Sequence, residues 1–339
     1  MTVRIQKDAL NLREELADLR KPSGIAGEAL LRADSVQEQR DLIGAGRKNL
    51  IINGNFQVSQ RGDFTTATSF TDNTILLDRW HINKGAAGSA TVQQLDVGVR
   101  LEATTSYTGL LGLRQKLERK SSEPFRYNTL TLSAWVKSNN PNASVMLYDN
   151  PWRSERDAHS GNGGWEKLSI TFDYTQNVEG PSGYSVMAQV GMDGVGSANI
   201  SVTSGDYVEV KEVQLELGSV ATEFEHRSYG EELALCQRYY YRVVDRMTAQ
   251  WTYWNTNDGY ATFTHPVTMR AYPTLLTSGA GCFDVFANGV HYQSDSTSVL
   301  GVAGLQSCEV AIYTASQSNI SGFVRFYNAT GWYSFDAEL

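Results

Sequence analysis

The chain has 339 residues, of which 41% are hydrophobic and 19% charged, and its formal net charge is −8. This hydrophobic content allows a sizeable core and excludes a disordered chain, while the negative charge argues against a nucleic-acid-binding protein, which presents a basic surface. No run of about 20 apolar residues is present, so we expect no membrane insertion. With 30 glycines and 17 tyrosines, the composition favours strands and turns over helical bundles.

The N-terminal region, residues 1–48, carries a helical pattern. Apolar side chains recur at spacings that alternate between four and three residues, which are the a and d positions of about two heptads; they are Ile5, Ala9, Leu12, Leu16 and Leu19. A helix this short is marginally stable in water, so we expect it to need a partner. We predict a short parallel coiled coil in a homotrimer, or docking on another protein. The simpler alternative is a helix that packs on the chain's own globular domain.

Two segments connect this region to the rest of the chain. The segment 35–46, SVQEQRDLIGAG, predicts a second short helix that ends at its glycines. In the segment 47–62, RKNLIINGNFQVSQRG, an apolar run stops at Asn53-Gly54 and then resumes. The pattern predicts a strand that enters a β domain and is interrupted there by a turn or bulge.

Alternating apolar and polar residues dominate the region 49–227. The segments 130–138, LTLSAWVKS, and 165–174, WEKLSITFDY, place apolar side chains on one face and polar side chains on the other. Similar short segments follow at regular intervals, with Gly, Asn and Asp between them. Many short strands with turn signals between them predict a jelly-roll β-sandwich.

Three strings, in the same order along the chain, resemble segments of bacteriophage tail-fibre and related virion proteins. The first is SVQEQRDLIGAG. The second is NLIINGNF with the following QRG and, further on, Asp78-Arg79-Trp80; the third is 214–240, QLELGSVATEFEHRSYGEELALCQRYY. Beyond the first string, the resemblance covers about residues 49–240 and implies a jelly roll like that of carbohydrate-binding modules. It also implies that residues 1–48 attach the chain to another virion protein and that the β domains meet a host-surface polysaccharide or lipopolysaccharide.

The C-terminal region, residues 228–339, predicts a short helix at Glu231–Tyr240 and then several aromatic-rich strands. We expect a second, smaller β-sandwich that forms the tip of the molecule. Aromatic faces stack on sugar rings while polar neighbours bind hydroxyl groups. The candidate glycan-binding residues here are Trp251, Tyr253, Trp254, Asn255, Asp258 and Tyr260. The alternative is that these aromatic residues belong to the core or the sheet surface.

The polar stretch 149–164, DNPWRSERDAHSGNGG, is predicted to be a long turn. Because loops on rigid scaffolds carry binding groups, Trp152 is a further candidate for glycan or subunit contact, together with Arg153, Arg156 and His159. The alternative is an ordinary hairpin loop in which Trp152 packs against the sandwich.

No motif for catalysis, metal or cofactor binding is present. The chain lacks a nucleophile elbow, a phosphate loop and a dinucleotide fingerprint, and its five histidines lie far apart. Three widely spaced cysteines predict buried, reduced thiols. The acids Asp206, Glu209, Glu212 and Glu216 are interpreted as solvated strand faces, with a structural Ca²⁺ site as the alternative. We therefore predict a protein that is not an enzyme and has no metal and no cofactor.

Together these features predict a mainly β protein, with short N-terminal helices, a jelly-roll β-sandwich and a smaller C-terminal β-sandwich. The predicted function is that of a phage tail-fibre subunit that binds host glycans and is located in the virion. Because the N-terminus lacks a signal peptide, we expect it to be made in the host cytoplasm. The alternatives are a structural capsid fibre or decoration protein without receptor binding, and a polysaccharide depolymerase.

Overall fold

The computed structural model divides the chain by its internal contacts into two units, Met1–Lys48 and Asn49–Leu339. The residues that it describes are 48–118, 128–149, 153–173, 184–194, 200–243, 248–255, 258–277, 283–287, 290–293, 301–313, 322–326 and 333–338. The heptad positions and the second predicted helix lie outside the described residues. The predicted boundary between a jelly roll ending at residue 227 and a separate C-terminal domain stays a prediction.

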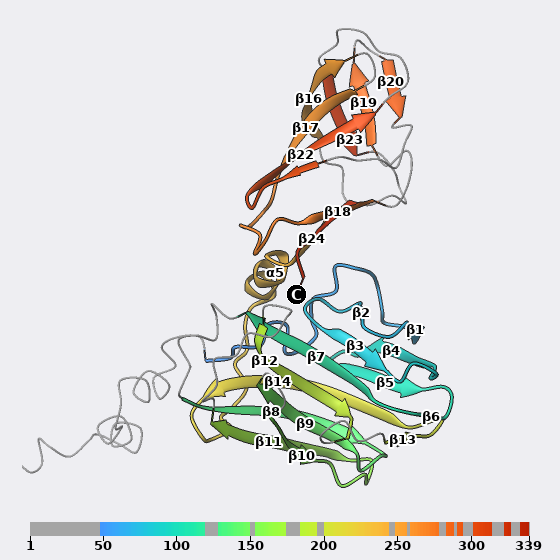
Figure 1. Ribbon diagram of the computed structural model, residues 1–339, viewed down its shortest axis with the longest axis vertical. Coiled ribbons are helices and arrows are strands. Elements are labelled where there is room, and N and C mark those ends of the chain that lie inside the picture. The colour runs from blue at the N-terminus through green and yellow to red at the C-terminus, as the bar shows by residue number, and fades with distance from the viewer. Residues whose placement is uncertain are drawn as a thin grey trace, which may run out of the picture. The chain divides into compact units, whose positions relative to one another are not determined.

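The first part of the described chain forms two six-stranded antiparallel sheets (Figure 1). In order, the first sheet contains β1 (Thr68–Ser69), β4 (Ala90–Gln94), β5 (Val99–Ala103), β14 (Tyr207–Leu217), β8 (Thr129–Ser138) and β11 (Trp165–Asp173). The second contains β10 (Arg153–Ala158), β9 (Ala143–Asp149), β12 (Tyr184–Met192), β7 (Leu111–Glu118), β3 (His81–Lys84) and β2 (Thr74–Ile75). A short pair joins β13 (Ser201–Val202) to β6 (Tyr107–Thr108). The predicted mainly β, jelly-roll fold is confirmed.

Strand β11 shows how the alternating sequence builds the sandwich. Leu168 and Phe172 are buried, whereas Ser169 and Thr171 between them are exposed. Successive side chains of a strand point to opposite faces, so one face of the sheet enters the core. Residues of both sheets join in a single buried cluster that includes Val136 and is apolar throughout. The hydrophobic effect on this shared face holds the two layers together.

The segment before β1 corrects one prediction. Leu50–Ile52 is not a strand, although the Leu50 amide donates to the Leu215 carbonyl of β14 at 2.8 Å. The Asn49 side chain occupies the neighbouring pairing positions: its Oδ1 accepts from the Leu215 amide at 3.1 Å, and its Nδ2 donates to the Val213 carbonyl at 3.1 Å. A side-chain amide therefore replaces the backbone ladder that a strand would make.

The predicted interruption at Asn53-Gly54 is confirmed as a turn. Asn53 has a φ of 59°, a left-handed conformation that asparagine tolerates better than most residues. Gly54 is required for a different reason, since a Cβ atom there would lie 2.2 Å from the Val213 carbonyl oxygen. The Val213 amide also donates to the Gly54 carbonyl at 2.9 Å. Close approach of the turn to β14 therefore depends on glycine.

The predicted long turn at 149–164 is also partly wrong. Residues Arg153–Ala158 form β10, which pairs along its whole length with β9. The turn proper begins at His159, a buried side chain whose Nδ1 accepts from the Gly161 amide at 2.8 Å. His159 thus shapes the turn from inside, and Trp152 lies outside the described residues.

After the jelly roll, helix α5 (Tyr229–Gln237) begins with a complete capping box between Ser228 and Glu231. A three-stranded antiparallel sheet follows, made of β15 (Tyr240–Val243), β24 (Tyr333–Asp336) and β18 (Thr274–Thr277). A seven-stranded antiparallel sheet contains β20 (Val290–Gln293), β19 (Phe283–Ala287), β23 (Gly322–Phe326), β16 (Thr248–Asn255), β17 (Asp258–Thr264), β22 (Ser307–Tyr313) and β21 (Gly301–Ala303). Within the described ranges, no helix has the length and apolar character needed to cross a membrane.

Candidate functional site

The predicted aromatic candidates of the C-terminal region come together on one β-hairpin. In the register of β16 and β17, Trp251 pairs with Ala261, Thr252 with Tyr260, and Asn255 with Asp258. The backbone therefore brings the candidates close in space. Their side chains lie outside the described part of the chain, so a glycan site on this hairpin stays a prediction.

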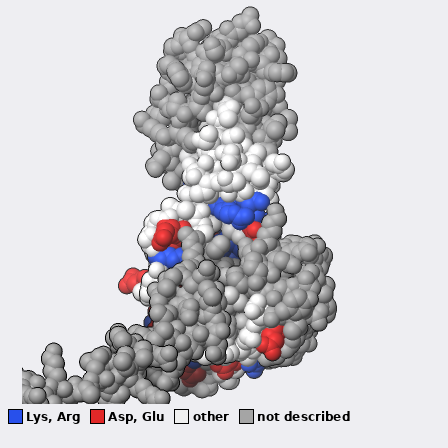
Figure 2. Space-filling view, turned by 90° about the vertical axis from the view of Figure 1, so that its left-hand side faces the viewer, with Lys and Arg blue, Asp and Glu red and all other residues white. Residues whose placement is uncertain are grey.

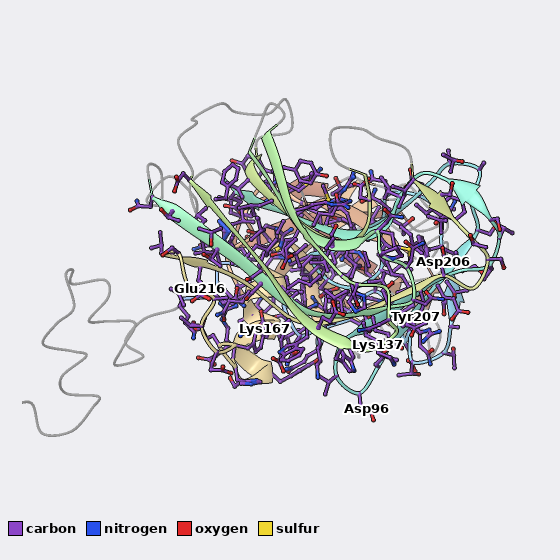
Figure 3. The ribbon with its side chains drawn as sticks, turned by 90° about the horizontal axis from the view of Figure 1, so that it is seen from below. Asp96, Lys137, Lys167, Asp206, Tyr207 and Glu216 are labelled. Carbon is purple, nitrogen blue, oxygen red and sulfur yellow. The ribbon has the colours of Figure 1, made fainter. Side chains whose placement is uncertain are left out.

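A second aromatic surface, which the sequence analysis did not single out, lies on the outer face of the first sheet. Cross-strand pairs form one row of Trp165, Lys137, Glu209 and Arg100, and a neighbouring row of Lys167, Trp135 and Lys211. Figure 3 labels Lys137, Lys167 and Tyr207 on this sheet. We call this surface the aromatic platform, which consists of Arg100, Trp135, Lys137, Trp165, Lys167, Tyr207, Glu209 and Lys211.

The other half of the same face is covered by the segment 218–225. Thr131 Oγ1 donates to the Gly218 carbonyl at 2.7 Å, and Gln214 Nε2 donates to the Glu223 carbonyl at 3.2 Å. Glu216 is buried there and accepts from Thr222 Oγ1 at 2.6 Å. The chain thus covers one half of the sheet face with its own backbone, whereas Trp165 in the aromatic platform is exposed.

The two buried acids of β14 correct the interpretation of solvated strand faces. Glu209 is only 7% exposed and is paired with Arg100 at 2.6 Å and with Lys137 at 3.1 Å. Glu216 is 3% exposed and holds the covering segment. Among the described residues, no group of three or more His, Cys, Asp or Glu side chains could hold a metal ion. These acids organise cations and backbone on the sheet face.

The aromatic platform combines flat rings with fixed charges. Trp165 is 37% exposed, and the Arg100 guanidinium lies 4.1 Å from the centre of the Tyr207 ring. The Lys211 ammonium lies 4.7 Å from the centre of the Trp165 ring and 6.0 Å from that of Trp135. Cation–π contacts of this kind hold flexible lysines over the rings. An exposed indole bordered by ordered polar groups suits the stacking and hydrogen bonding of a sugar ring.

The outer face of the second sheet carries a polar row. Arg114 of β7 donates to Gln189 of β12, and Gln189 Nε2 donates in turn to Asp193. The Arg156 guanidinium donates to the Asp193 carbonyl at 3.0 Å, and Tyr148 lies 3.4 Å from the Asp193 carboxylate. Gln189 is fully buried. The polar groups of these side chains are hydrogen-bonded to one another, so the row links four strands of the sheet.

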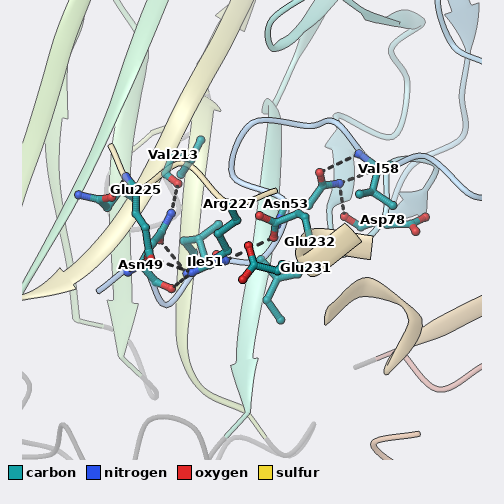
Figure 4. Close-up of polar contacts among 12 residues, drawn as sticks. Asn49, Ile51, Asn53, Val58, Asp78, Val213, Glu225, Arg227, Glu231 and Glu232 are labelled. Carbon is teal, nitrogen blue, oxygen red and sulfur yellow. Dashed lines mark hydrogen bonds and ion pairs between the residues drawn. The ribbon is translucent and has the colours of Figure 1, made fainter. Parts of the chain in front are cut away.

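The second and third strings, residues 47–62 with Asp78-Arg79-Trp80 and residues 214–240, meet in a buried polar network. The first string, residues 35–46, lies outside the described residues. The Asn53 side chain donates to the carbonyls of Val58 and Asp78 at 2.8 and 3.0 Å, and the Asn53 amide donates to Glu232 of α5 at 2.5 Å. Arg227 donates to the Ile51 carbonyl at 3.0 Å (Figure 4). Side chains of these two strings therefore join segments that are far apart in the sequence.

A second network ties the C-terminal end of the chain to Asp78-Arg79-Trp80. Arg79 is 2% exposed and forms an ion pair with Glu338. Arg61 bridges Asp336 at 3.1 Å and Asp78 at 3.5 Å. On the described part of the face in Figure 2, Lys and Arg atoms (blue) lie next to Asp and Glu atoms (red). Asp78-Arg79-Trp80 and Arg61 thus anchor β24 and the residues that follow it.

The buried Asp78 makes the stability of this second network depend on pH. Burial raises its pKa to about 6, against the opposing effects of Arg61 and Gln60. A carboxyl whose folded pKa lies above its unfolded value binds its proton more tightly in the folded protein. Its contribution to stability is therefore most favourable below the unfolded pKa, near 3.8, and declines as the pH rises through about 6.

Asp78→Asn should remove this dependence. The free energy of unfolding of the wild type, relative to the variant, should fall by about 2–3 kcal/mol between pH 4 and pH 7. Urea titrations of both proteins at several pH values measure this difference. The pKa of Glu338 is shifted in the opposite direction, because Arg79 and Arg61 outweigh the effect of burial and hold it low. Glu338 is present in both proteins, so its contribution is common to the two titrations. A difference that stays constant with pH would contradict the assignment.

Of the three predicted buried thiols, Cys236 is confirmed: it is fully buried in α5, and burial raises its pKa. The side chains of Cys282 and Cys308 lie outside the described residues. The prediction that the protein is not an enzyme stays a prediction.

Comparison with known proteins matches no family model and no curated sequence. Among solved structures, the chain is similar to TmCBM61 in complex with beta-1,4-galactotriose, with 13% identity over 51% of this chain and 100% of that chain and a TM-score of 0.29. It is also similar to the CBM22-1 xylan-binding domain of Paenibacillus barcinonensis Xyn10C, with 14% identity over 47% of this chain and 99% of that domain and a TM-score of 0.26.

A third similar structure is the enzymatically active domain of bacteriophage CBA120 tailspike protein 4, with 11% identity over 50% of this chain and 21% of that chain and a TM-score of 0.28. Likeness at this level carries no argument about the ligand or role of the present chain.

Proposed function

We propose that the protein is a subunit of a bacteriophage virion fibre that binds host-surface glycans through its jelly roll. The observation that carries the glycan part is the aromatic platform, where the exposed Trp165 borders ordered charged groups on the outer face of the first sheet. The motif strings support the virion part, because their residues resemble those of phage fibres. Residues 1–48 would attach the subunit and form a homotrimer, and several weak sites would together give useful avidity.

Trp165→Ala should weaken glycan binding about 30-fold or more, as expected for loss of a central aromatic contact. The measurement is retention of the full chain on immobilised bacterial polysaccharides and lipopolysaccharides. Tyr272→Ala is the matched control, because Tyr272 is a 73% exposed aromatic residue outside the aromatic platform. Equal retention of both variants would place the glycan site elsewhere, for which the hairpin of β16 and β17 is the next candidate.

The virion assignment needs its own experiment. A specific antibody against the chain should label intact phage particles at fibres, and light scattering of the full chain should give the mass of a trimer. Labelling of the capsid, together with no retention on any glycan and no blocking of adsorption, would instead support a structural decoration protein. Release of reducing sugar from a retained polysaccharide would support a depolymerase.

A further inference from the structure

The charges of the aromatic platform are not balanced evenly. Arg100 and Lys137 share the carboxylate of Glu209, and Arg100 also pairs with Glu102 at 2.8 Å. These two cations are thus neutralised by neighbours on the same face. They are fixed in place and are poorly suited to a charged ligand, because binding it would require breaking existing ion pairs.

Lys211 differs from these cations. In the described part of the chain, no carboxylate lies within 4.0 Å of its ammonium, which is held between the rings of Trp165 and Trp135. Lys167, on the other side of Trp135 in the same row, donates to the Thr222 carbonyl at 3.2 Å, and among the described residues no carboxylate pairs with it either. The chain as a whole carries a net charge of −8, so a general excess of cations does not explain this arrangement.

The position of Lys211 suits a particular ligand group. The Lys211 ammonium lies over the Trp165 ring, 4.7 Å from its centre. A sugar ring that stacks on the part of the indole left exposed would place its substituents beside this ammonium. A carboxylate there would form a charge-assisted hydrogen bond, which is stronger than a bond to a neutral hydroxyl. A neutral sugar would leave the ammonium without such a partner.

We propose that the aromatic platform selects glycans that contain uronic acids, with Trp165 stacking on the sugar ring and Lys211 binding its carboxylate. This inference rests on the proposed glycan-binding function and adds the ligand class. It also assigns separate roles to the two residues: Trp165 determines whether a sugar binds, and Lys211 determines whether an acidic sugar is preferred.

The test uses the full chain and three uronate polymers, polygalacturonate, hyaluronate and alginate, each compared with its methyl ester. The ester keeps the sugar ring and removes the charge. We expect the wild type to bind at least one acid form about tenfold more tightly than its ester, and we expect added salt to reduce this preference. Lys211→Gln should lose the preference and Lys211→Arg should keep it.

Two controls separate the possible results. Lys84→Gln removes a lysine outside the aromatic platform and should leave the preference unchanged; if it abolishes the preference, net charge and not Lys211 is responsible. Trp165→Ala should weaken the binding of acid and ester alike. Trp165-dependent binding that is equal for acid and ester, or confined to neutral glycans, would overturn the inference while leaving the proposed function intact. No retention on any glycan, neutral or acidic, would overturn both.

Discussion

Arg79→Met should lower the free energy of unfolding by about 3–5 kcal/mol, because it leaves the carboxylate of Glu338 buried without its closest cation. Both side chains are almost completely inaccessible, at 2% and 6% exposure. The guanidinium also donates to the Lys116 carbonyl at 2.8 Å and lies 3.5 Å from the centre of the Tyr239 ring. Methionine preserves much of the volume, so the loss is chiefly electrostatic.

Urea unfolding of the full chain at pH 7 measures this loss. Arg238→Met is the matched control: Arg238 pairs with Glu118 at 2.8 Å, and that carboxylate is also largely buried, but Arg238 is 39% exposed and water can take its place, so we expect a cost of about 1 kcal/mol. Adding Glu338→Gln to Arg79→Met should restore part of the stability, since the uncompensated charge is removed. Equal costs for the two arginine variants would show that burial does not control the strength of this pair.

Trp80→Ala should destabilise the protein by about 3–5 kcal/mol, the usual cost of deleting a buried large aromatic side chain. Trp80 is fully buried, its ring centre lies 5.1 Å from that of Phe56, and its Nε1 donates to the Asn53 carbonyl at 2.9 Å. The residue therefore both fills the core and holds the turn at Asn53-Gly54. Its removal creates a cavity and leaves the Asn53 carbonyl with the Phe56 amide, at 3.1 Å, as its remaining donor.

Trp80→Phe separates these two contributions. Phenylalanine keeps most of the packing and loses the hydrogen bond, so we expect a cost of about 1–3 kcal/mol. Thermal and urea unfolding of the two variants give the comparison, and near-ultraviolet circular dichroism reports whether the aromatic packing around Phe56 changes. If Phe and Ala substitutions cost the same, the hydrogen bond to Asn53, and not the packing of the ring, is the dominant contribution.

Arg79→Met and Trp80→Ala also test the role of the strings that resemble phage-fibre segments. Asn53, Asp78, Arg79 and Trp80 are buried and hold together the turn, α5 and the last strand. A buried, internally paired set is suited to stability and poorly placed to contact a host surface. We therefore expect both variants to affect unfolding strongly and, in the folded fraction, to leave glycan retention unchanged.

The mainly β jelly-roll fold could be predicted from sequence because its signal is local. The alternation of apolar and polar residues in β8 and β11 predicts which side chains enter the core. This prediction does not depend on which strands pair. The dipeptide Asn53-Gly54 likewise predicts a turn, because both residue types are common in turns. The same local logic failed for Leu50–Ile52, since the side chain of the preceding residue, Asn49, takes over the pairing with β14, a strand more than 150 residues later in the chain.

The candidate binding surface was not predicted, because it depends on register. Trp165, Trp135 and Lys211 belong to three strands that are far apart in sequence, and only the pairing of β11, β8 and β14 places them on one face. Residue types alone also could not separate Glu209 and Glu216, which are buried and paired, from solvated acids. By itself the sequence determined the fold class and the turn, since backbone preference and burial pattern are local properties. Only the tertiary structure decided which aromatic residues and charges are neighbours, because strand register and the cover supplied by the segment 218–225 arise from contacts distant in the chain.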